Sequence, residues 1–171
     1  YAVWCEAFAP PEAREPASRY QVLLAERGKA HETRIVGIRH PGLAPLPFLT
    51  EEAGFRLALE QMAAGAPALA GLPLLYLPEG LAGRPDLLER TEGTPSRFGP
   101  YAYRVVEIKS ARPLGTADLI QAAFYNDLLG KIQGVELPTV TLINRDGQAF
   151  EHAMEELRPR LKEALEGTRA I

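Results

Sequence analysis

The sequence predicts an α/β fold in which helices flank a central mixed β-sheet. Short runs of Val, Ile and Leu lie between turn-forming residues, which is typical of buried strands. Other segments repeat apolar residues every three to four positions, as amphipathic helices do. A chain of 171 residues suits one domain with a single core. Because it begins at Tyr1 rather than Met, the chain suggests a fragment or a processed start.

Two helices are expected first, followed by strands. The first covers 17–38 with Ser18 as its cap, and Thr50 caps a second, which closes at Gly65. Glu51 and Glu52 are favourable at the positive end of this second helix. Prolines make 1–16 and 41–47 irregular. Three adjacent strands are expected next, within 71–78, 81–90 and 103–110, with a loop or open hairpin connection at 90–100. They are followed by a helix from 116 or 118 to about 129, a strand at 139–144 with a turn and a short paired segment, and a closing helix at about 151–166.

The composition narrows the classes of function. Nineteen basic against 22 acidic residues give a formal charge of −3, which is not the balance of a general polyanion-binding protein. The lone cysteine, Cys5, excludes an intramolecular disulfide and any four-cysteine metal site. No run has the length of a membrane span and no secretory signal is visible, so a cytoplasmic protein is expected.

The run from Tyr103 to Ser110 combines an apolar strand with two charges. Side chains alternate along a strand, so Glu107 and Lys109 share one face and Ile108 lies on the other. An unpaired buried charge is costly, so an internal ion pair or a strand end that reaches solvent would explain the two residues. A functional site is the third explanation.

Asp86 favours the functional explanation. If the strand at 81–90 pairs with that at 103–110, Asp86 and Glu107 lie together. Two carboxylates and the backbone carbonyl of Ile108 form an all-oxygen site that suits Mg²⁺ or Mn²⁺. Lys109 would then orient or deprotonate a metal-bound water, or balance charge on a phosphodiester.

Polar residues on two predicted helices extend this group. Gln121 and Tyr125 are four residues apart and share a helix face, where they either hold a phosphate or a metal-bound water, or brace the strand. His31 lies on or beside the apolar stripe of the first helix, and is a metal ligand or an ordinary core or surface histidine. The adjacent Glu32 is expected to point elsewhere and to pair with a basic neighbour.

The order of these motifs resembles a known nuclease signature. Pro85 and Asp86, twenty residues, and then Glu107-Ile108-Lys109 resemble the PD-(D/E)xK pattern. With the helical His31, the G-x-x-D at 83–86 and the Q-x-x-x-Y at 121–125, the set is similar to the RecB-like branch of that superfamily. This branch includes the nuclease domains of recombination helicases and the CRISPR-associated exonucleases.

The resemblance implies a restriction-endonuclease-like core and a Mg²⁺- or Mn²⁺-dependent deoxyribonuclease, expected to be an exonuclease that acts in DNA repair. Its substrate would be single-stranded DNA or ended duplex, with a helicase or further domains as partners. By this resemblance His31, Asp86, Glu107 and the carbonyl of Ile108 hold the metal, and Lys109 positions and activates the attacking water. The residues that would contact the substrate are Arg84, Arg112, Gln121 and Tyr125. Some RecB-like nucleases carry a four-cysteine iron–sulfur cluster, which this sequence cannot form.

Two other functions stay open. One is a non-catalytic nucleic-acid-binding or scaffolding module with the nuclease fold, which the acidic composition favours and the complete set of motif side chains disfavours. The other is a different metal hydrolase, although the sequence has no Gly-rich phosphate loop, H-E-x-x-H or G-x-S-x-G element. Local basic patches for DNA would come from Arg84, Arg97, Arg104 and Arg112 around the site, with Lys131 at the end of its helix.

Overall fold

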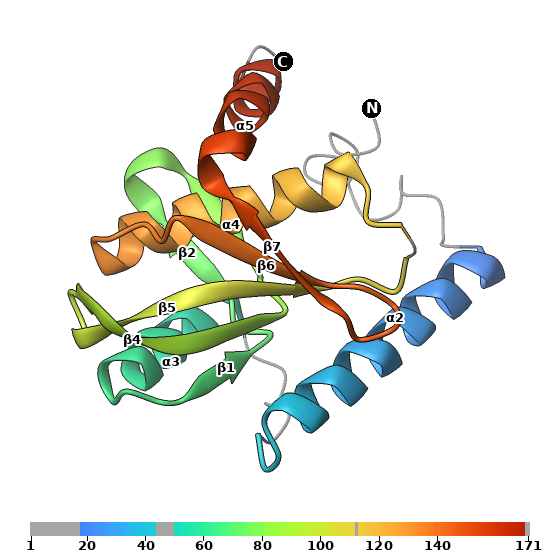
Figure 1. The fold of residues 1–171 in the computed structure, drawn as a ribbon, viewed down its shortest axis with the longest axis horizontal. Coiled ribbons are helices and arrows are strands. Elements are labelled where there is room, and N and C mark those ends of the chain that lie inside the picture. The colour runs from blue at the N-terminus through green and yellow to red at the C-terminus, as the bar shows by residue number, and fades with distance from the viewer. Residues whose placement is uncertain (1–17, 44–49, 112, 170–171) are drawn as a thin grey trace.

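The computed structural model describes residues 18–43, 50–111 and 113–169 (Figure 1). The predicted irregular segment at 1–16, the proline-rich loop residues 45 and 47, Cys5 and Arg112 lie outside these ranges. Within them the fold is α/β with a mixed central sheet flanked by helices, as predicted. None of the helices in the described ranges is long and apolar enough to cross a membrane.

The central sheet has five strands in the order β1-β4-β5-β6-β7. Only β5 and β6 are parallel, and the other three pairs of neighbours are antiparallel. The strands are β1 (Ala68–Ala70), β4 (Leu87–Ser96), β5 (Gly99–Ile108), β6 (Thr139–Ile143) and β7 (Ala149–Ala153). The predicted strand at 139–144 and its short paired partner are therefore confirmed.

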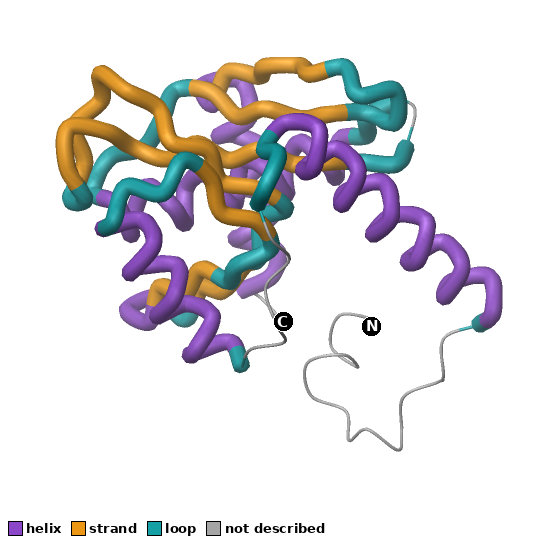
Figure 2. Tube along the Cα trace, turned by 90° about the horizontal axis from the view of Figure 1, so that it is seen from below, coloured by secondary structure: helices purple, strands orange, loops and turns teal. Residues whose placement is uncertain are grey.

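Helices cover both faces of this sheet, with apolar cores between the layers (Figures 1 and 2). Ile35 and Val36 of α2 (Arg19–Arg39) pack on one face, in a cluster that includes Leu87. The next residue, Leu88, faces the opposite way, in the core under α3 (Glu51–Ala63) and α4 (Thr116–Gln133). A third cluster joins α4 to β6 and α5 (Met154–Arg169). This alternation is that of a strand buried on both faces.

Local capping signals place the first two described helices as predicted. Ser18 accepts a hydrogen bond from the amide of Gln21, whose side chain accepts one from the amide of Ser18, so α2 begins with a capping box. His40 ends it. Thr50 caps α3, and the left-handed Gly65 follows its end at φ 70°.

The helix α4 is longer than predicted, by about one turn. It continues through Gly130 to Gln133 and ends at Gly134, which has φ 78°. Gly130 is not a stop signal. A Cβ atom there would lie 2.9 Å from Cβ of Glu136, so the glycine allows the returning chain to approach the helix.

The predicted single strand at 81–90 is wrong. It divides into β3 (Leu81–Gly83), which pairs with β2 (Leu74–Tyr76) in a separate two-stranded sheet, and β4, which starts at Leu87. A short 3₁₀ helix, η2 (Leu77–Glu79), connects β2 to β3. Pro85 lies in the break and has no amide hydrogen for a ladder. The three predicted segments are still neighbours in sequence order, because the first pairs with β3 in the two-stranded sheet and the second pairs with the third, as β4 and β5, in the central sheet.

Two other boundaries differ from the prediction. The segment at 90–100 is the hairpin connection that was one of its two expected forms, but it is shorter than expected, because β4 extends to Ser96 and β5 begins at Gly99. Its loop-like composition is accommodated by a register shift between Glu92 and Ser96, with Gly93 at φ 81°. The closing helix starts at Met154 rather than near 151, because 151–153 belong to β7 and pair with β6.

Candidate functional site

Asp86 and Glu107 meet where β4 begins and β5 ends. Leu87 pairs with Val106, so the preceding residue Asp86 comes opposite Glu107. The amide of Asp86 donates a hydrogen bond to Oε1 of Glu107 at 3.1 Å, and the amide of Ile108 donates one to Oδ2 of Asp86 at 2.7 Å. The two acids are therefore brought together by the strand pairing.

A hydrogen-bonded chain leads from Glu107 to α4. Lys109 Nζ donates to Glu107 Oε2 at 2.9 Å and to Gln121 Oε1 at 2.7 Å. Gln121 Nε2 in turn donates to the hydroxyl of Tyr125 at 2.9 Å. Gln121 and Tyr125 thus share a helix face, as their spacing predicted, and the face is turned toward Lys109.

The glycine of the G-x-x-D motif is in contact with the tyrosine of the Q-x-x-x-Y motif. A Cβ atom built on Gly83 would lie 2.6 Å from Cε1 and 2.7 Å from Cδ1 of Tyr125. These distances are far below a van der Waals contact, so any side chain at this position would displace the ring. The absence of a side chain at Gly83 sets the position of Tyr125, and through it that of Gln121.

The site extends from the buried Glu107 to the exposed Gln121 and holds more negative than positive groups. Glu107 is only 1% exposed, and burial, together with the charge of Asp86, raises its pKa to about 7. Burial also raises the pKa of Asp86, although the amide of Ile108 opposes the change. For Lys109, burial lowers the pKa, but the carboxylates of Glu107 and Asp86 outweigh it and the net pKa is raised. Two acids therefore compete for one ammonium.

The structure adds Lys29 and Glu32 of α2 to this neighbourhood. Their side chains form an ion pair of 2.9 Å, which confirms the predicted basic partner of Glu32. After the larger effect of burial, Glu32 raises and Lys29 lowers the pKa of Asp86, while the direction in which Glu32 points stays a prediction. The spacing along the helix is the signal that could have placed these residues, because Val36, one turn after Glu32, packs in the cluster of Leu87 and Ile108.

His31 lies on the same helix, one turn before the buried Ile35. Its Nδ1 is 3.3 Å from Nη2 of Arg34, and its buried Nε2 has no hydrogen-bond partner in the described part of the chain. Within residues 18–43, 50–111 and 113–169, no three His, Cys, Asp or Glu side chains are arranged as a metal-binding group. The role of His31 as a ligand stays a prediction.

The arginines and lysines expected around the site are differently placed. Arg84 is held by the carbonyl of Gly71, at 3.3 Å, and by the carboxylate of Glu51. Arg104 lies an odd number of residues from Glu107 on the same strand and points to the opposite face of the sheet. Lys131 pairs with Glu79 near the C-terminal end of α4. The prediction of a basic patch around the site is therefore wrong for Arg104, which is engaged by Glu89, whereas Lys131 lies in the last turn of its helix, as predicted.

Comparison with known proteins does not assign a family to this chain. A scan against protein-family models and a search of curated proteins both find no match. The resemblance to RecB-like nucleases therefore depends on the motifs, their order and the contacts among them.

Proposed function

We propose that this protein is a metal-dependent deoxyribonuclease with a restriction-endonuclease-like core, which hydrolyses phosphodiester bonds at the ends of DNA. One observation carries the proposal. Asp86, Glu107 and Lys109 meet at adjoining strand ends, with 2.9 Å between Lys109 Nζ and Glu107 Oε2. Gln121 of α4 contacts the same ammonium at 2.7 Å. Three of the four sequence motifs, G-x-x-D, E-x-K and Q-x-x-x-Y, thus contribute to one group of contacts.

The donor atoms of this group fit Mg²⁺ or Mn²⁺. Both ions favour oxygen ligands, and Mg²⁺ is commonly bound by only one or two carboxylates with water completing its shell. Asp86 and Glu107 would hold the ion, because these two carboxylates face a single ammonium, that of Lys109, and a bound cation would offset the excess negative charge. The amide of Ile108 points to Asp86, and in an extended strand its carbonyl lies on the same side, so this oxygen would be the third ligand of a bound ion. The bound ion would supply Lewis-acid stabilisation of the charge that develops on the phosphate.

The chain's own residues position the water and the substrate. An ammonium has three hydrogens, and Lys109 uses two of them on Glu107 and Gln121. The third is available for the attacking water or a non-bridging phosphate oxygen. Gln121 fixes the direction of Lys109, and Tyr125 fixes that of Gln121. Preorganised donors of this kind reduce the cost of orientation during the reaction.

Cleavage of linear single- and double-stranded DNA in the presence of Mn²⁺ tests the proposal. Lys109→Ala should lower the rate by roughly 10²-fold or more, the effect of removing one well-placed donor. Lys131→Ala is the matched control, since this lysine pairs with Glu79 away from the site and its loss should leave the rate unchanged. Equal cleavage by wild-type protein and Lys109→Ala would contradict the assigned chemistry.

A non-catalytic DNA-binding or scaffolding module is the second candidate. The formal charge of −3 favours it, and so does the engagement of Arg104 and Lys131 in ion pairs. Calorimetry with Mn²⁺ separates the two functions, because a scaffold does not need the ion. In either case, steep salt dependence of DNA binding would reveal phosphate contacts.

A further inference from the structure

Apolar packing attaches α2 to the sheet over a short part of its length. Within this helix, all of which is described, only Ile35 and Val36 are buried. Tyr20 near its start is 68% exposed. In Figure 2 the N-terminal end of α2 projects beyond the strands. One turn of apolar contact does not define the direction of a helix of 21 residues, so polar contacts at its end matter.

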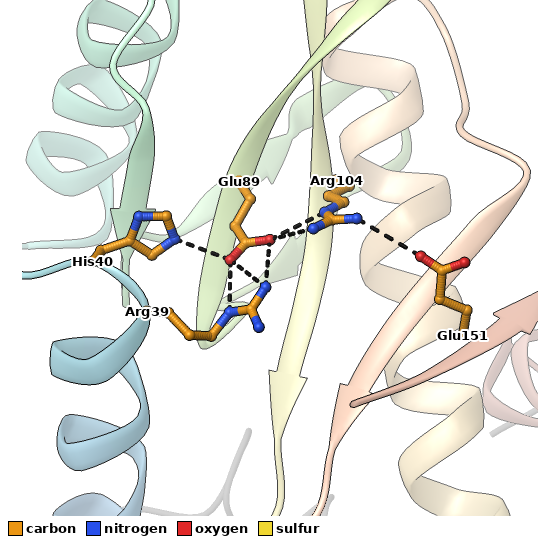
Figure 3. Close-up of polar contacts among 5 residues, drawn as sticks. All are labelled: Arg39, His40, Glu89, Arg104 and Glu151. Carbon is orange, nitrogen blue, oxygen red and sulfur yellow. Dashed lines mark hydrogen bonds and ion pairs between the residues drawn. The ribbon is translucent and has the colours of Figure 1, made fainter. Parts of the chain in front are cut away.

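Those contacts are made by a cluster around Glu89, a residue of β4 that is 5% exposed (Figure 3). Arg39, the last residue of α2, donates from Nε to Oε1 at 2.8 Å and from Nη2 to Oε2 at 3.0 Å. His40, the C-cap, places Nε2 2.9 Å from Oε1. The planar guanidinium and the carboxylate thus meet through two parallel hydrogen bonds, an arrangement that restricts direction as well as distance.

The opposite side of the same carboxylate is held by the sheet. Arg104 of β5 donates to Oε2 from Nε at 3.1 Å and from Nη2 at 2.7 Å. Its Nη1 lies 3.7 Å from the carboxylate of Glu151 on β7. Burial raises the pKa of Glu89, but the hydrogen bonds from Arg39, His40 and Arg104 outweigh this and lower the pKa to about 2. Glu89 is therefore a charged bridge between the sheet and the end of α2.

The helix and strand joined at Glu89 also form part of the candidate site. Glu89 lies three residues after Asp86, and Arg39 lies seven residues after Glu32. Glu32 and Lys29 are one and two turns before Val36, which packs beside Leu87. Lys29 pairs with Glu32 at 2.9 Å while its side chain stays 70% exposed, so Lys29 is accessible from solvent.

We propose that Lys29 is a substrate-binding residue that contacts a DNA phosphate, and that Glu89 is the positioning residue that holds α2 and Lys29 beside the site. The role of Lys29 rests on the proposed nuclease function, whereas the attachment of α2 by Glu89 does not. An exposed ammonium held by a neighbouring carboxylate suits a phosphate next to the one that is cleaved, and such a contact carries no sequence preference.

Hydrogen exchange tests the attachment of α2 independently of function. Glu89→Gln should speed exchange in 19–39 by about tenfold or more and leave α4 and β6 protected, because only the helix loses its anchor. Arg39→Ala, which keeps Arg104 on Glu89, should have the same local effect if Glu89→Gln does not fold. Glu92→Gln is the control on the same strand, at a side chain that is 66% exposed, and should change nothing. Unchanged exchange in α2, or a uniform rise through the sheet, would overturn the positioning role.

Kinetics with Mn²⁺ and linear DNA test the link to Lys29. Lys29→Ala should raise KM about tenfold and leave kcat within about twofold, as expected for loss of a uniform binding contact. Arg39→Ala should raise KM similarly, and the double variant should show no further rise, because both changes remove the same contact. Independent, multiplying effects would refute the link. Absence of cleavage by the wild-type protein would instead refute the nuclease function, and hydrogen exchange would still decide the attachment.

Discussion

Substitution of Gly83 by alanine is a direct test of the contact between Gly83 of the G-x-x-D motif and Tyr125 of the Q-x-x-x-Y motif. The new Cβ atom would lie 2.6 Å from Cε1 of Tyr125, whereas carbon atoms in contact are about 3.5 to 4.0 Å apart. The ring must therefore move by about 1 Å, or β3 must move away from α4. In an unconstrained strand the same substitution would stabilise the protein slightly, because alanine reduces the freedom of the unfolded chain.

The expected cost follows from this overlap. Forcing one extra carbon into a packed contact typically costs about 1–3 kcal/mol. A displacement of about 1 Å would lengthen the 2.9 Å contact between Gln121 Nε2 and the hydroxyl of Tyr125 beyond hydrogen-bond range. Gln121 would then be free to rotate away from Lys109. If the protein is a nuclease, a misplacement of this size should also lower its rate by about 10²-fold.

Urea denaturation of a double-mutant cycle isolates the effect. The cycle consists of the wild-type protein, Gly83→Ala, Tyr125→Ala and the double variant. Gly83→Ala should lose about 1–3 kcal/mol in the wild-type background and close to nothing once the ring is gone. The control is Gly37→Ala, at a position where a Cβ atom meets open space. An equal cost of Gly83→Ala with and without the tyrosine ring would refute the steric argument.

Three further predictions concern stability. Gln133→Ala should cost about 2–4 kcal/mol in urea denaturation, because the buried amide bonds both the N–H and the C=O of Tyr103, and a smaller loss would show that water replaces it. Gly37→Ala should raise the melting temperature, because alanine in a helix is favoured over glycine by up to about 1 kcal/mol. Gly130→Ala in another helix should lower the melting temperature, because its Cβ atom would lie 2.9 Å from Glu136. Stabilisation by both substitutions would contradict the packing at Gly130. The pKa of Glu89 is lowered from 4.5 to about 2, so the stability that its ionised form contributes is complete above about pH 4.5 and is lost as the pH falls through 2. The difference in unfolding free energy between wild type and Glu89→Gln should shrink by about 3 kcal/mol over that range, and a constant difference would show that the carboxylate is not stabilised.

Features set by neighbouring residues were predictable from the sequence. The starts of α2 and α3 follow from Ser18 and Thr50, whose side chains accept hydrogen bonds from amides three residues later. The alignment of Gln121 with Tyr125 follows from one turn of helix. The meeting of Asp86 and Glu107 was predictable as well, although it also required the correct guess that their two segments pair.

Features that depend on distant segments were not predictable. The composition of 90–100 indicates a loop, but cross-strand pairing with 99–103 turns most of it into strand. The break before β4 separates β3 into another sheet, because Gly83 packs on Tyr125 of α4, a contact across more than forty residues. The rotation of α2 about its axis is likewise set by the packing of Ile35 and Val36 on the sheet.

By itself, the sequence determined where α2 and α3 begin and which acids, amine and amide stand at motif spacing. These depend on interactions within one turn of helix or one strand, which neighbouring residues define. The tertiary structure decided the division of the strands between two sheets, the engagement of Arg104 by Glu89 away from the site, and the influence of Lys29 and Glu32 on the pKa of Asp86. These depend on how the elements pack, since the face that a charged side chain presents is set by the partner that buries the opposite face.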